Sequence, residues 1–334
     1  MIILVTGCIG MIGYNVCMKL LNDTAVKTVI GVDIGKGLRE SEFLLRRYQN
    51  FKYYKLDIGN YNALKDIFNK YKIDLVYHFA ALACEGLSYY SRSEFYHTNT
   101  IGTGNIVSLC VENNCRLVYT SSMSVYGDQI PPFHETMDYR PQDPYAISKT
   151  ASEMDIINAG KYQDLKYTIL RLQNVYGPGQ NIRDPYRNVI TIWIKKYLQG
   201  LPITVYGDGS SERSFTYVDD IIPGIIKAGT LGNTIGKIIN IGSMKKMTIE
   251  ETSRMFSIVV NCKVIHIEKR QEVKSAFIDN TLSIHLLGIE YKTSFTAGIL
   301  KSIKWFRENV NIKDLEQEVF ENIECRKDIP SFYT

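Results

Sequence analysis

Apolar runs and helical stretches alternate along the first half of the chain. Residues 1–6 form a short apolar run, glycines follow, and residues 14–21 then show a helical pattern. The alternation continues and predicts strands at 1–6, 28–32, 51–56, 75–79, 116–120 and 166–171, with helices at 14–21, 60–70, 91–113 and from 145 onward. Strands separated by helices favour a parallel, doubly wound α/β sheet with right-handed crossovers.

The pattern becomes more mixed in the second half. Residues 173–188 are rich in Gly, Pro and Asn and predict a functional loop, because they are long for a simple connection. Helices are then expected at 189–199, 218–230, 248–260 and up to about 309, among strands at 203–206, 214–217, 237–241 and 264–267. We expect one domain at 1–175, a smaller mixed α/β domain mainly at 176–310 that closes a cleft, and a polar tail at 311–334. Some segments of the second half should return to the first domain.

Composition narrows the class of protein. The chain has 334 residues, of which 45% are hydrophobic and 22% charged, as in an ordinary soluble globular protein. Its net charge of +4 is dispersed, which disfavours nucleic-acid binding, and no apolar run is long enough to span a membrane. The seven cysteines include no Cys-x-x-Cys pair and no histidine spacing suited to zinc, so we expect no metal site. Buried thiols in a reducing, cytoplasmic compartment explain them better, and the amino terminus reads as a strand and turn rather than a signal peptide.

Glycines follow the first strand at Gly7, Gly10 and Gly13. A strand, a glycine turn and a helix form the context of a dinucleotide fingerprint, in which a pyrophosphate lies at the helix amino terminus. A glycine triplet alone also fits a plain turn. Here the next strand ends in Asp33, about 20 residues after the last glycine, and a carboxylate there binds ribose hydroxyls. This predicts a Rossmann-type domain that prefers NAD to NADP, a preference moderated by the nearby Lys36 and Arg39.

Tyr145 and Lys149 stand four residues apart in a predicted helix and therefore share one face. A free tyrosine has a pKa of about 10, so it acts as a base near neutral pH only if its phenolate is stabilised by about 4 kcal/mol. The lysine ammonium supplies such stabilisation, and Ser122, at the end of a predicted buried strand, is placed to relay a proton. Taken alone, the pair also fits an ordinary surface helix.

Ligands of parallel sheets gather at the carboxyl ends of the strands. The expected contacts at these ends are Gly7, Gly10, Met11, Ile12, Gly13, Asp33, Asp57, Ile58, Phe79, Ala80, Ala81, Ser121 and Ser122.

Several motifs in order resemble the extended short-chain dehydrogenase/reductase family, and within it the nucleotide-sugar epimerases and dehydratases. They are TGCIGMIG at 6–13, HFAA at 78–81, TSSMSVYGD at 120–128, PYAISK at 144–149, RLQNVYGPGQN at 171–181 and VYGDGSSERSFTYVDD at 205–220. The resemblance covers roughly residues 1–305. It is strongest for UDP-glucose/UDP-galactose 4-epimerases.

The resemblance implies a site and a mechanism. Tyr145, helped by Ser122, would take the proton of the sugar C4 hydroxyl while hydride moves to NAD, and Lys149 would hold the nicotinamide ribose. Asn99 would join the cofactor site. Asn174, Asn188 and Val189 would bind diphosphate and uridine, Tyr206 would stack on uracil, and Arg213 and Arg270 would clamp the diphosphate of a UDP-sugar. A homodimer through helices 91–113 and 145–161 is also implied.

Departures from the family pattern bear on the reaction. Dehydratases carry an Asp-Glu pair after the Ser122 position and decarboxylating relatives a Glu two residues on, whereas this chain has Met123 and Ser124. This favours a UDP-hexose 4-epimerase over the alternatives: a keto-sugar reductase, a dehydratase, or a non-catalytic cofactor sensor. Ala276, aligned with a pocket-gating position, would leave room for N-acetylhexosamines. The segment 82–86 lacks the lysine that galactose epimerases often carry, so the comparison with that family implies a different hold on sugar or cofactor there.

Some residues have simpler interpretations. We expect His78, Trp193 and Trp305 to be core residues rather than site residues. For Glu85, ligand contact and a solvated carboxylate remain equally open.

Overall fold

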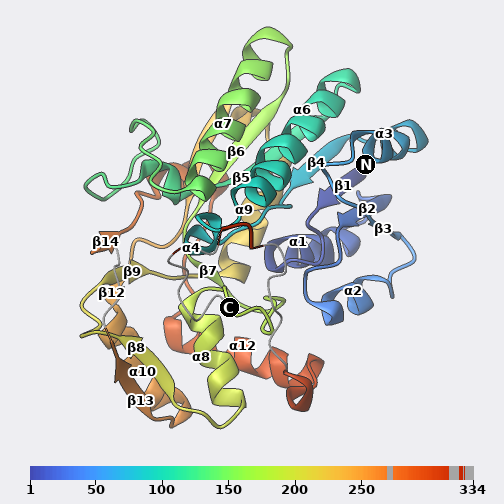
Figure 1. Cartoon of the computed structure of the whole chain (residues 1–334). Coiled ribbons are helices and arrows are strands. Elements are labelled where there is room, and N and C mark those ends of the chain that lie inside the picture. The colour runs from blue at the N-terminus through green and yellow to red at the C-terminus, as the bar shows by residue number, and fades with distance from the viewer. Residues whose placement is uncertain (269–273, 316–322, 326, 328–334) are drawn as a thin grey trace.

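The computed structural model describes residues 1–268, 274–315, 323–325 and 327 (Figure 1). Its centre is a seven-stranded parallel sheet in the order β3-β2-β1-β4-β5-β6-β11. These strands are β1 (Ile2–Thr6), β2 (Thr28–Asp33), β3 (Phe51–Lys55), β4 (Leu75–His78), β5 (Arg116–Ser122), β6 (Tyr167–Leu172) and β11 (Lys237–Ile241). The direction of the strand order reverses between β1 and β4, where doubly wound sheets bind ligands. The expected Rossmann-type α/β fold is confirmed.

Helices cover both faces of the sheet. α1 (Met11–Leu21) and α9 (Val218–Thr230) pack on one face. The other face carries α3 (Tyr61–Lys70), α6 (Gly102–Glu112) and α7 (Pro144–Tyr162). Because neighbouring side chains of a strand point to opposite faces, Ile3 and Val5 of β1 join the first core while Leu4 joins the second. α9 and β11 show that part of the second half belongs to the central sheet.

The segment expected as one helix at 91–113 has three parts. It consists of α5 (Arg92–Phe95), a π-helical stretch (Tyr96–Ile101) and α6. π-Helical turns are rare and often lie at functional sites. This one places Asn99 in the interior, behind the loop that follows β4.

A second region packs beside the sheet, in the lower half of Figure 1. It contains α8 (Val189–Leu198), α10 (Ile249–Val260) and α12 (Phe295–Asn309), whose apolar side chains share one core around Trp193. Its small sheets pair β7 (Val175–Tyr176) with β10 (Thr216–Tyr217), β8 (Ile203–Tyr206) with β13 (Val264–Ile267), and β9 (Glu212–Ser214) with β12 (Lys246–Thr248) and β14 (Ser275–Ala276). Short helices α2 (Arg39–Leu45), α4 (Glu85–Ser88) and α11 (Thr281–Leu287) are also present, together with 3₁₀ turns at Met123–Tyr126, Gly232–Thr234 and Ile312–Asp314.

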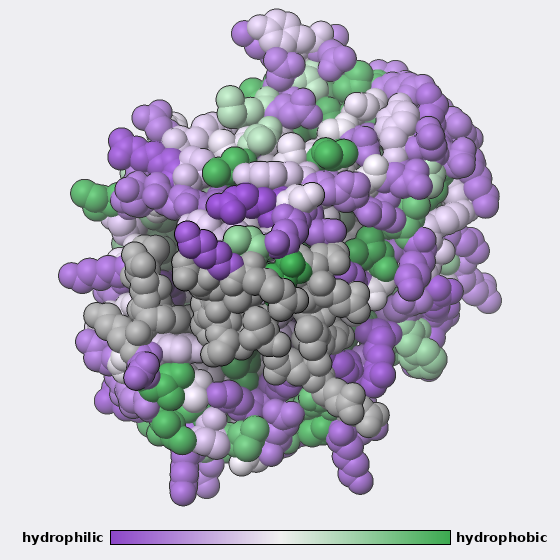
Figure 2. All heavy atoms as spheres, viewed as in Figure 1, coloured by the Kyte–Doolittle hydropathy of each residue, from purple (hydrophilic) through white to green (hydrophobic). Residues whose placement is uncertain are grey.

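The surface is mixed in character. On the face shown in Figure 2, hydrophilic residues predominate and apolar ones are scattered among them. Within the described ranges, none of the helices combines the length and the apolar character needed to cross a bilayer.

Candidate active site

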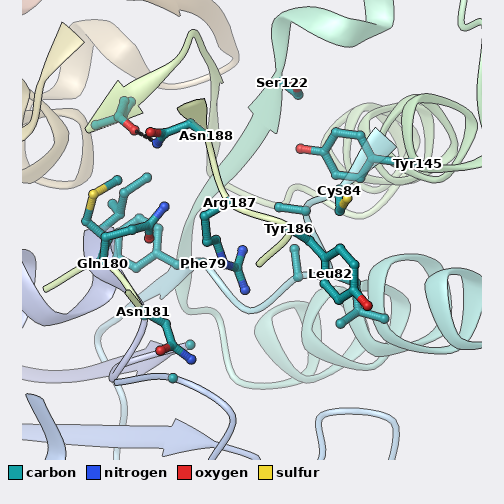
Figure 3. A pocket seen from close by; sticks show the side chains of 18 of the residues that line it. Phe79, Leu82, Cys84, Ser122, Tyr145, Gln180, Asn181, Tyr186, Arg187 and Asn188 are labelled. Atoms are coloured by element: carbon teal, nitrogen blue, oxygen red, sulfur yellow. Dashed lines mark hydrogen bonds between the residues drawn. The ribbon is translucent and has the colours of Figure 1, made fainter. Parts of the chain in front are cut away.

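A cavity of about 920 Å³ opens at the carboxyl ends of the central strands, between the sheet and the second region. Its lining includes most of the residues that the sequence predicted, namely Gly7, Gly10, Met11, Ile12, Gly13, Asp33, Ile58, Phe79, Ala80, Ala81, Ser121, Ser122, Tyr145, Lys149, Asn174, Asn188, Val189 and Tyr206. Figure 3 shows side chains that converge on this cavity from both sides. Residues far apart in the sequence therefore share one site.

The glycine turn leaves the amino end of α1 open. Gly7 has a φ of +65°, and a Cβ there would lie 2.7 Å from the backbone nitrogen of Ala80. A Cβ at Gly13 would collide with the carbonyl oxygen of Gly7. Gly10 caps α1 without a side chain, and the first turn has no acidic residue. The free amides of this turn and the dipole of α1 favour an anion such as a pyrophosphate.

Asp33 ends β2 beside this turn. Its carboxylate is almost buried and accepts hydrogen bonds from the backbone N–H groups of Gly35 (2.9 Å) and Ile9 (3.3 Å). Burial raises the pKa of Asp33, and these two hydrogen bonds oppose the shift. Ser121, near the carboxyl end of β5, also lines the cavity, and its buried hydroxyl has no partner among the described residues. The pocket thus offers an anion cradle, a carboxylate for ribose hydroxyls and an unused hydroxyl, a donor set that fits NAD.

Tyr145 enters the cavity from the first turn of α7. The Asp143 carboxylate caps this helix by accepting a hydrogen bond from the Ala146 N–H (2.8 Å), and Pro144 starts it with a suitable φ. Burial raises the pKa of the Tyr145 phenol, the nearby Ser122 hydroxyl lowers it, and the charges of Glu85 and Asp143 raise it further. The two hydroxyls expected to share a substrate proton therefore lie together.

Lys149 is buried one helical turn after Tyr145. Its Nζ donates to the carbonyl oxygen of Thr120 (2.9 Å) and lies 4.8 Å from the centre of the Tyr119 ring. Burial lowers the pKa of Lys149 to about 7, an effect that Glu153 partly opposes. The ammonium thus fixes α7 against the end of β5, which carries Ser121 and Ser122.

Two predicted cofactor residues do not line the cavity. Asp57 is exposed, accepts a hydrogen bond from the Gly59 N–H (2.8 Å) and pairs with His97 (3.2 Å). Asn99 is buried and holds both backbone groups of Leu82, accepting from its N–H (2.9 Å) and donating to its oxygen (3.0 Å). Their side chains shape the loops around the cavity.

Some of the predicted substrate residues line the cavity and others do not. Asn188 caps α8 by accepting from the Thr191 N–H (3.1 Å) and donates to the Val175 oxygen (2.9 Å). Asn174 donates to the oxygen of Ser214 (3.2 Å). Arg213, on β9, is not among the described residues that line the cavity, and Arg270 lies outside the described part of the chain.

The structure also bears on the expectations for Ala276 and His78. Ala276 is buried in a small apolar cluster with Tyr126 and Phe133 and does not line the cavity, so it lends no support to N-acetylhexosamines. His78 is a buried core residue, as expected, between the hydroxyls of Thr6 (2.6 Å) and Thr103 (2.9 Å).

Arg187 is a site residue that the sequence reasoning missed. Its side chain points into the cavity (Figure 3) and forms an ion pair with Asp184 (2.6 Å). The side chain is 27% exposed, yet its Nε is buried and has no hydrogen-bond partner among the described residues. The signal was an arginine in a long loop already predicted to be functional. A guanidinium with an unused N–H in this position is suited to phosphate oxygens.

A Rossmann-type sheet with an open glycine turn and a Tyr–Lys pair in its cleft defines a nicotinamide-dependent class of protein. Residues 3–242 match the NAD dependent epimerase/dehydratase family, and the chain belongs to this family of extended short-chain dehydrogenases. NAD is accordingly its cofactor. Epimerases and dehydratases share the family, and relatives named as dehydratases or as a decarboxylase match more than 90% of the chain, so membership does not by itself fix the reaction.

Three relatives illustrate the similarity. A UDP-glucuronate 4-epimerase of Thermodesulfobacterium geofontis is 33% identical, over 92% of this chain and 97% of its own length. The structure of a Thermotoga maritima UDP-glucose 4-epimerase with UDP-glucose has a TM-score of 0.85 and 28% identity, covering 93% of this chain and all of that chain. A Bacillus cereus UDP-glucuronic acid 4-epimerase with UDP-glucuronic acid and NAD has a TM-score of 0.83 and 28% identity, covering 92% and 99%.

Proposed function

We propose that the protein is an NAD-dependent nucleotide-sugar 4-epimerase whose substrate is a UDP-linked hexose. The observation that carries this proposal is the pairing of Tyr145 with Ser122 in a cavity that also fits NAD. Met123 and Ser124 follow Ser122, and neither side chain is an acid or base suited to water elimination or decarboxylation. The names of the three relatives described above support the same reaction.

The residues of the chain handle the proton. The glycine turn and Asp33 would hold NAD, which would supply a reversible acceptor for the hydride at C4 of the sugar. Tyr145 takes the proton of the C4 hydroxyl and gives it back, and the Ser122 hydroxyl holds the same oxygen. Because burial raises the pKa of Tyr145, the phenol needs a positive charge to act as a base, and Lys149 lies one helical turn away. With a pKa of about 7, this lysine exchanges a proton near neutral pH.

The substrate's nucleotide end faces the second region. Asn174, Asn188, Val189 and Tyr206 line this part of the cavity and would bind the diphosphate and the base. Arg187 adds the cation that a diphosphate requires. Asp33, with its carboxylate at the ribose position of the cofactor, favours NAD over NADP because it repels a 2′-phosphate.

The decisive experiment uses the protein as purified. It is incubated with UDP-glucose or UDP-N-acetylglucosamine without added cofactor, and products are separated by chromatography and identified by NMR. An epimerase with retained NAD yields the C4 epimer of at least one sugar. A strict requirement for added NADPH, or release of a dehydrated product, would show that the proposal is wrong.

We also propose that the protein forms a homodimer through α7 and the helical segment of α5 and α6. This segment and α7 expose Ile101 (54%), Ile147 (43%) and Met154 (59%) to solvent. Apolar side chains of this size on packed neighbouring helices favour a partner helix pair. A second copy of the same surface satisfies this by two-fold symmetry.

A further inference from the structure

Glu85 is the one acidic side chain that lines the cavity beside Tyr145 among the described residues. It begins α4, directly after the loop that leads from β4, and this loop is fixed by the two hydrogen bonds between Asn99 and Leu82. The Ser88 hydroxyl donates to the Glu85 carbonyl oxygen (2.6 Å) and steadies the short helix. The position of Glu85 is therefore set by the fold rather than by a bound ligand.

Titratable and charged groups from three parts of the fold interact with Glu85 or with its neighbours. Asp143 and Tyr145 face it from α7, Arg213 from β9, and Cys84 and Tyr89 from its own segment. Glu85 is exposed to solvent and lines the cavity. Burial raises the pKa of Glu85 to about 7, Asp143 raises it and Arg213 lowers it. Asp143 thus adds a second negative charge near Glu85, and Arg213 adds a positive one.

Glu85 lies beside the tyrosine proposed as the base. Cys84, the residue before it, packs in a small apolar cluster with Tyr145. The charge of Glu85 acts on the Tyr145 phenol. Because Tyr145 takes a proton from the sugar in the proposed reaction, groups next to its phenol contact the sugar. The hexose therefore meets a carboxylate.

We propose that Glu85 is a specificity-determining residue that selects nucleotide sugars whose hexose carries hydroxyl or ammonium groups and disfavours uronic acids. The inference rests on the proposed 4-epimerase function. A carboxylate accepts hydrogen bonds from hydroxyl or ammonium groups, whereas a sugar carboxylate would place a like charge beside it. Two of the relatives are named for UDP-glucuronate or UDP-glucuronic acid. The proposal predicts that this chain, because of Glu85, does not prefer that sugar.

The test compares the full-length wild-type protein with Glu85→Gln, using UDP-glucose and UDP-glucuronate and no added cofactor. Wild type should show a kcat/KM at least about tenfold higher for UDP-glucose, and the substitution should reduce this ratio at least about tenfold. Glu112→Gln, on the exposed end of α6, removes the same charge away from the cavity and should leave the ratio unchanged. Thermal melting of each variant confirms that it is folded.

A wild-type protein that prefers UDP-glucuronate, or a ratio that Glu85→Gln does not change, would overturn the role of Glu85. Turnover of neither sugar by wild type would instead count against the proposed function. In that case titration calorimetry with UDP-glucose and UDP-glucuronate tests Glu85 by binding alone. Tighter binding of UDP-glucose than of UDP-glucuronate by wild type, lost in Glu85→Gln, supports the role of Glu85. The same ratio of the two dissociation constants in wild type and Glu85→Gln rejects it.

Discussion

Arg171 on β6 forms an ion pair with Glu153 on α7 at 2.7 Å, and the two side chains are 1% and 0% exposed. The Tyr139 hydroxyl also donates to Glu153 (2.9 Å), so the buried carboxylate is well satisfied. Glu153 lies one helical turn after Lys149 on α7. The pair therefore ties the helix that carries Tyr145 and Lys149 to the sheet that carries Ser122.

Replacing Glu153 with Gln should lower the free energy of unfolding by about 3–5 kcal/mol, because the Arg171 charge is left buried without a counterion. Urea denaturation followed by circular dichroism measures the change. Glu308→Gln is the control, since its pair with Lys304 is exposed and should contribute no more than about 1 kcal/mol. Equal effects of the two substitutions would contradict a structural role for the buried pair.

Tyr145→Phe should lower kcat for epimerisation by at least about 100-fold, because the phenol oxygen that carries the proton is removed. The measurement is the initial rate with the best UDP-hexose. Tyr162→Phe removes the same hydroxyl from the exposed end of α7 and should leave the rate unchanged. A Tyr145→Phe protein with normal turnover would exclude the proposed proton transfer.

Arg187→Gln should raise the KM for the nucleotide sugar about tenfold or more, with a smaller effect on kcat. The guanidinium is expected to bind the diphosphate, and a charge-assisted hydrogen bond contributes about 1.5–3 kcal/mol. Arg213→Gln is the comparison, since the family resemblance predicts a diphosphate clamp at Arg213. A larger increase in KM for Arg213→Gln than for Arg187→Gln would favour the prediction from sequence over the one from the cavity lining.

The burial of a neutral His78 should lower the free energy of unfolding at acid pH. Burial, followed by the charge of Lys149, lowers its pKa from 6.5 to about 3. Above pH 6.5 the histidine is neutral in both states and the full stability is present. Below pH 6.5 the unfolded chain binds a proton that the folded protein does not, so the free energy of unfolding falls by up to about 1.4 kcal/mol per pH unit.

The quantity to measure is the slope of the unfolding free energy against pH between pH 6 and 4.5, rather than the free energy at a single pH. His78→Gln should flatten this slope by about 1.4 kcal/mol per pH unit. His285→Gln, on the exposed side of α11, should retain the wild-type slope. An unchanged slope in His78→Gln would mean that other groups cause the acid sensitivity.

The double substitution Ile147→Glu and Met154→Glu should convert the proposed dimer to a monomer. Charges buried between α7 helices of two copies would lack partners and would repel each other across the two-fold axis. Size-exclusion chromatography with light scattering reports the mass. Ile258→Glu alters an apolar residue on α10 that is 75% exposed and should leave the mass unchanged. A wild-type monomer would refute the proposal directly.

The central sheet could be predicted from sequence because its inner strands are buried on both faces. Runs such as residues 2–5 and 117–119 are wholly apolar, and polar residues mark their carboxyl ends. The short helices α2, α4 and α11 were not predicted, since segments of four to seven residues show too little periodicity. The π-helical stretch at 96–101 was also invisible, because its residues fit an ordinary helical pattern.

Much of the candidate site followed from the rule that ligands bind at strand ends, and Gly7, Asp33 and Ser122 all line the cavity. The rule does not tell which way a side chain points, and Asp57, which it assigned to the site, does not line the cavity. Asn99, which the family resemblance assigned to the cofactor site, does not line it either. Arg187 was missed because its place depends on the path of a loop, which has no periodicity to read. Tertiary contacts decide such positions.

Asn99 holds Leu82 by both of its backbone groups and is itself anchored through the hydroxyl of Ser148 on α7 (3.0 Å). The loop from Phe79 to Cys84 is thus ordered by folding, before any ligand arrives. The conformational entropy of this wall is lost during folding, so binding incurs little of that cost. A substitution of Asn99 would therefore weaken affinity through a segment 17 residues away in sequence, without removing a single contact to the ligand.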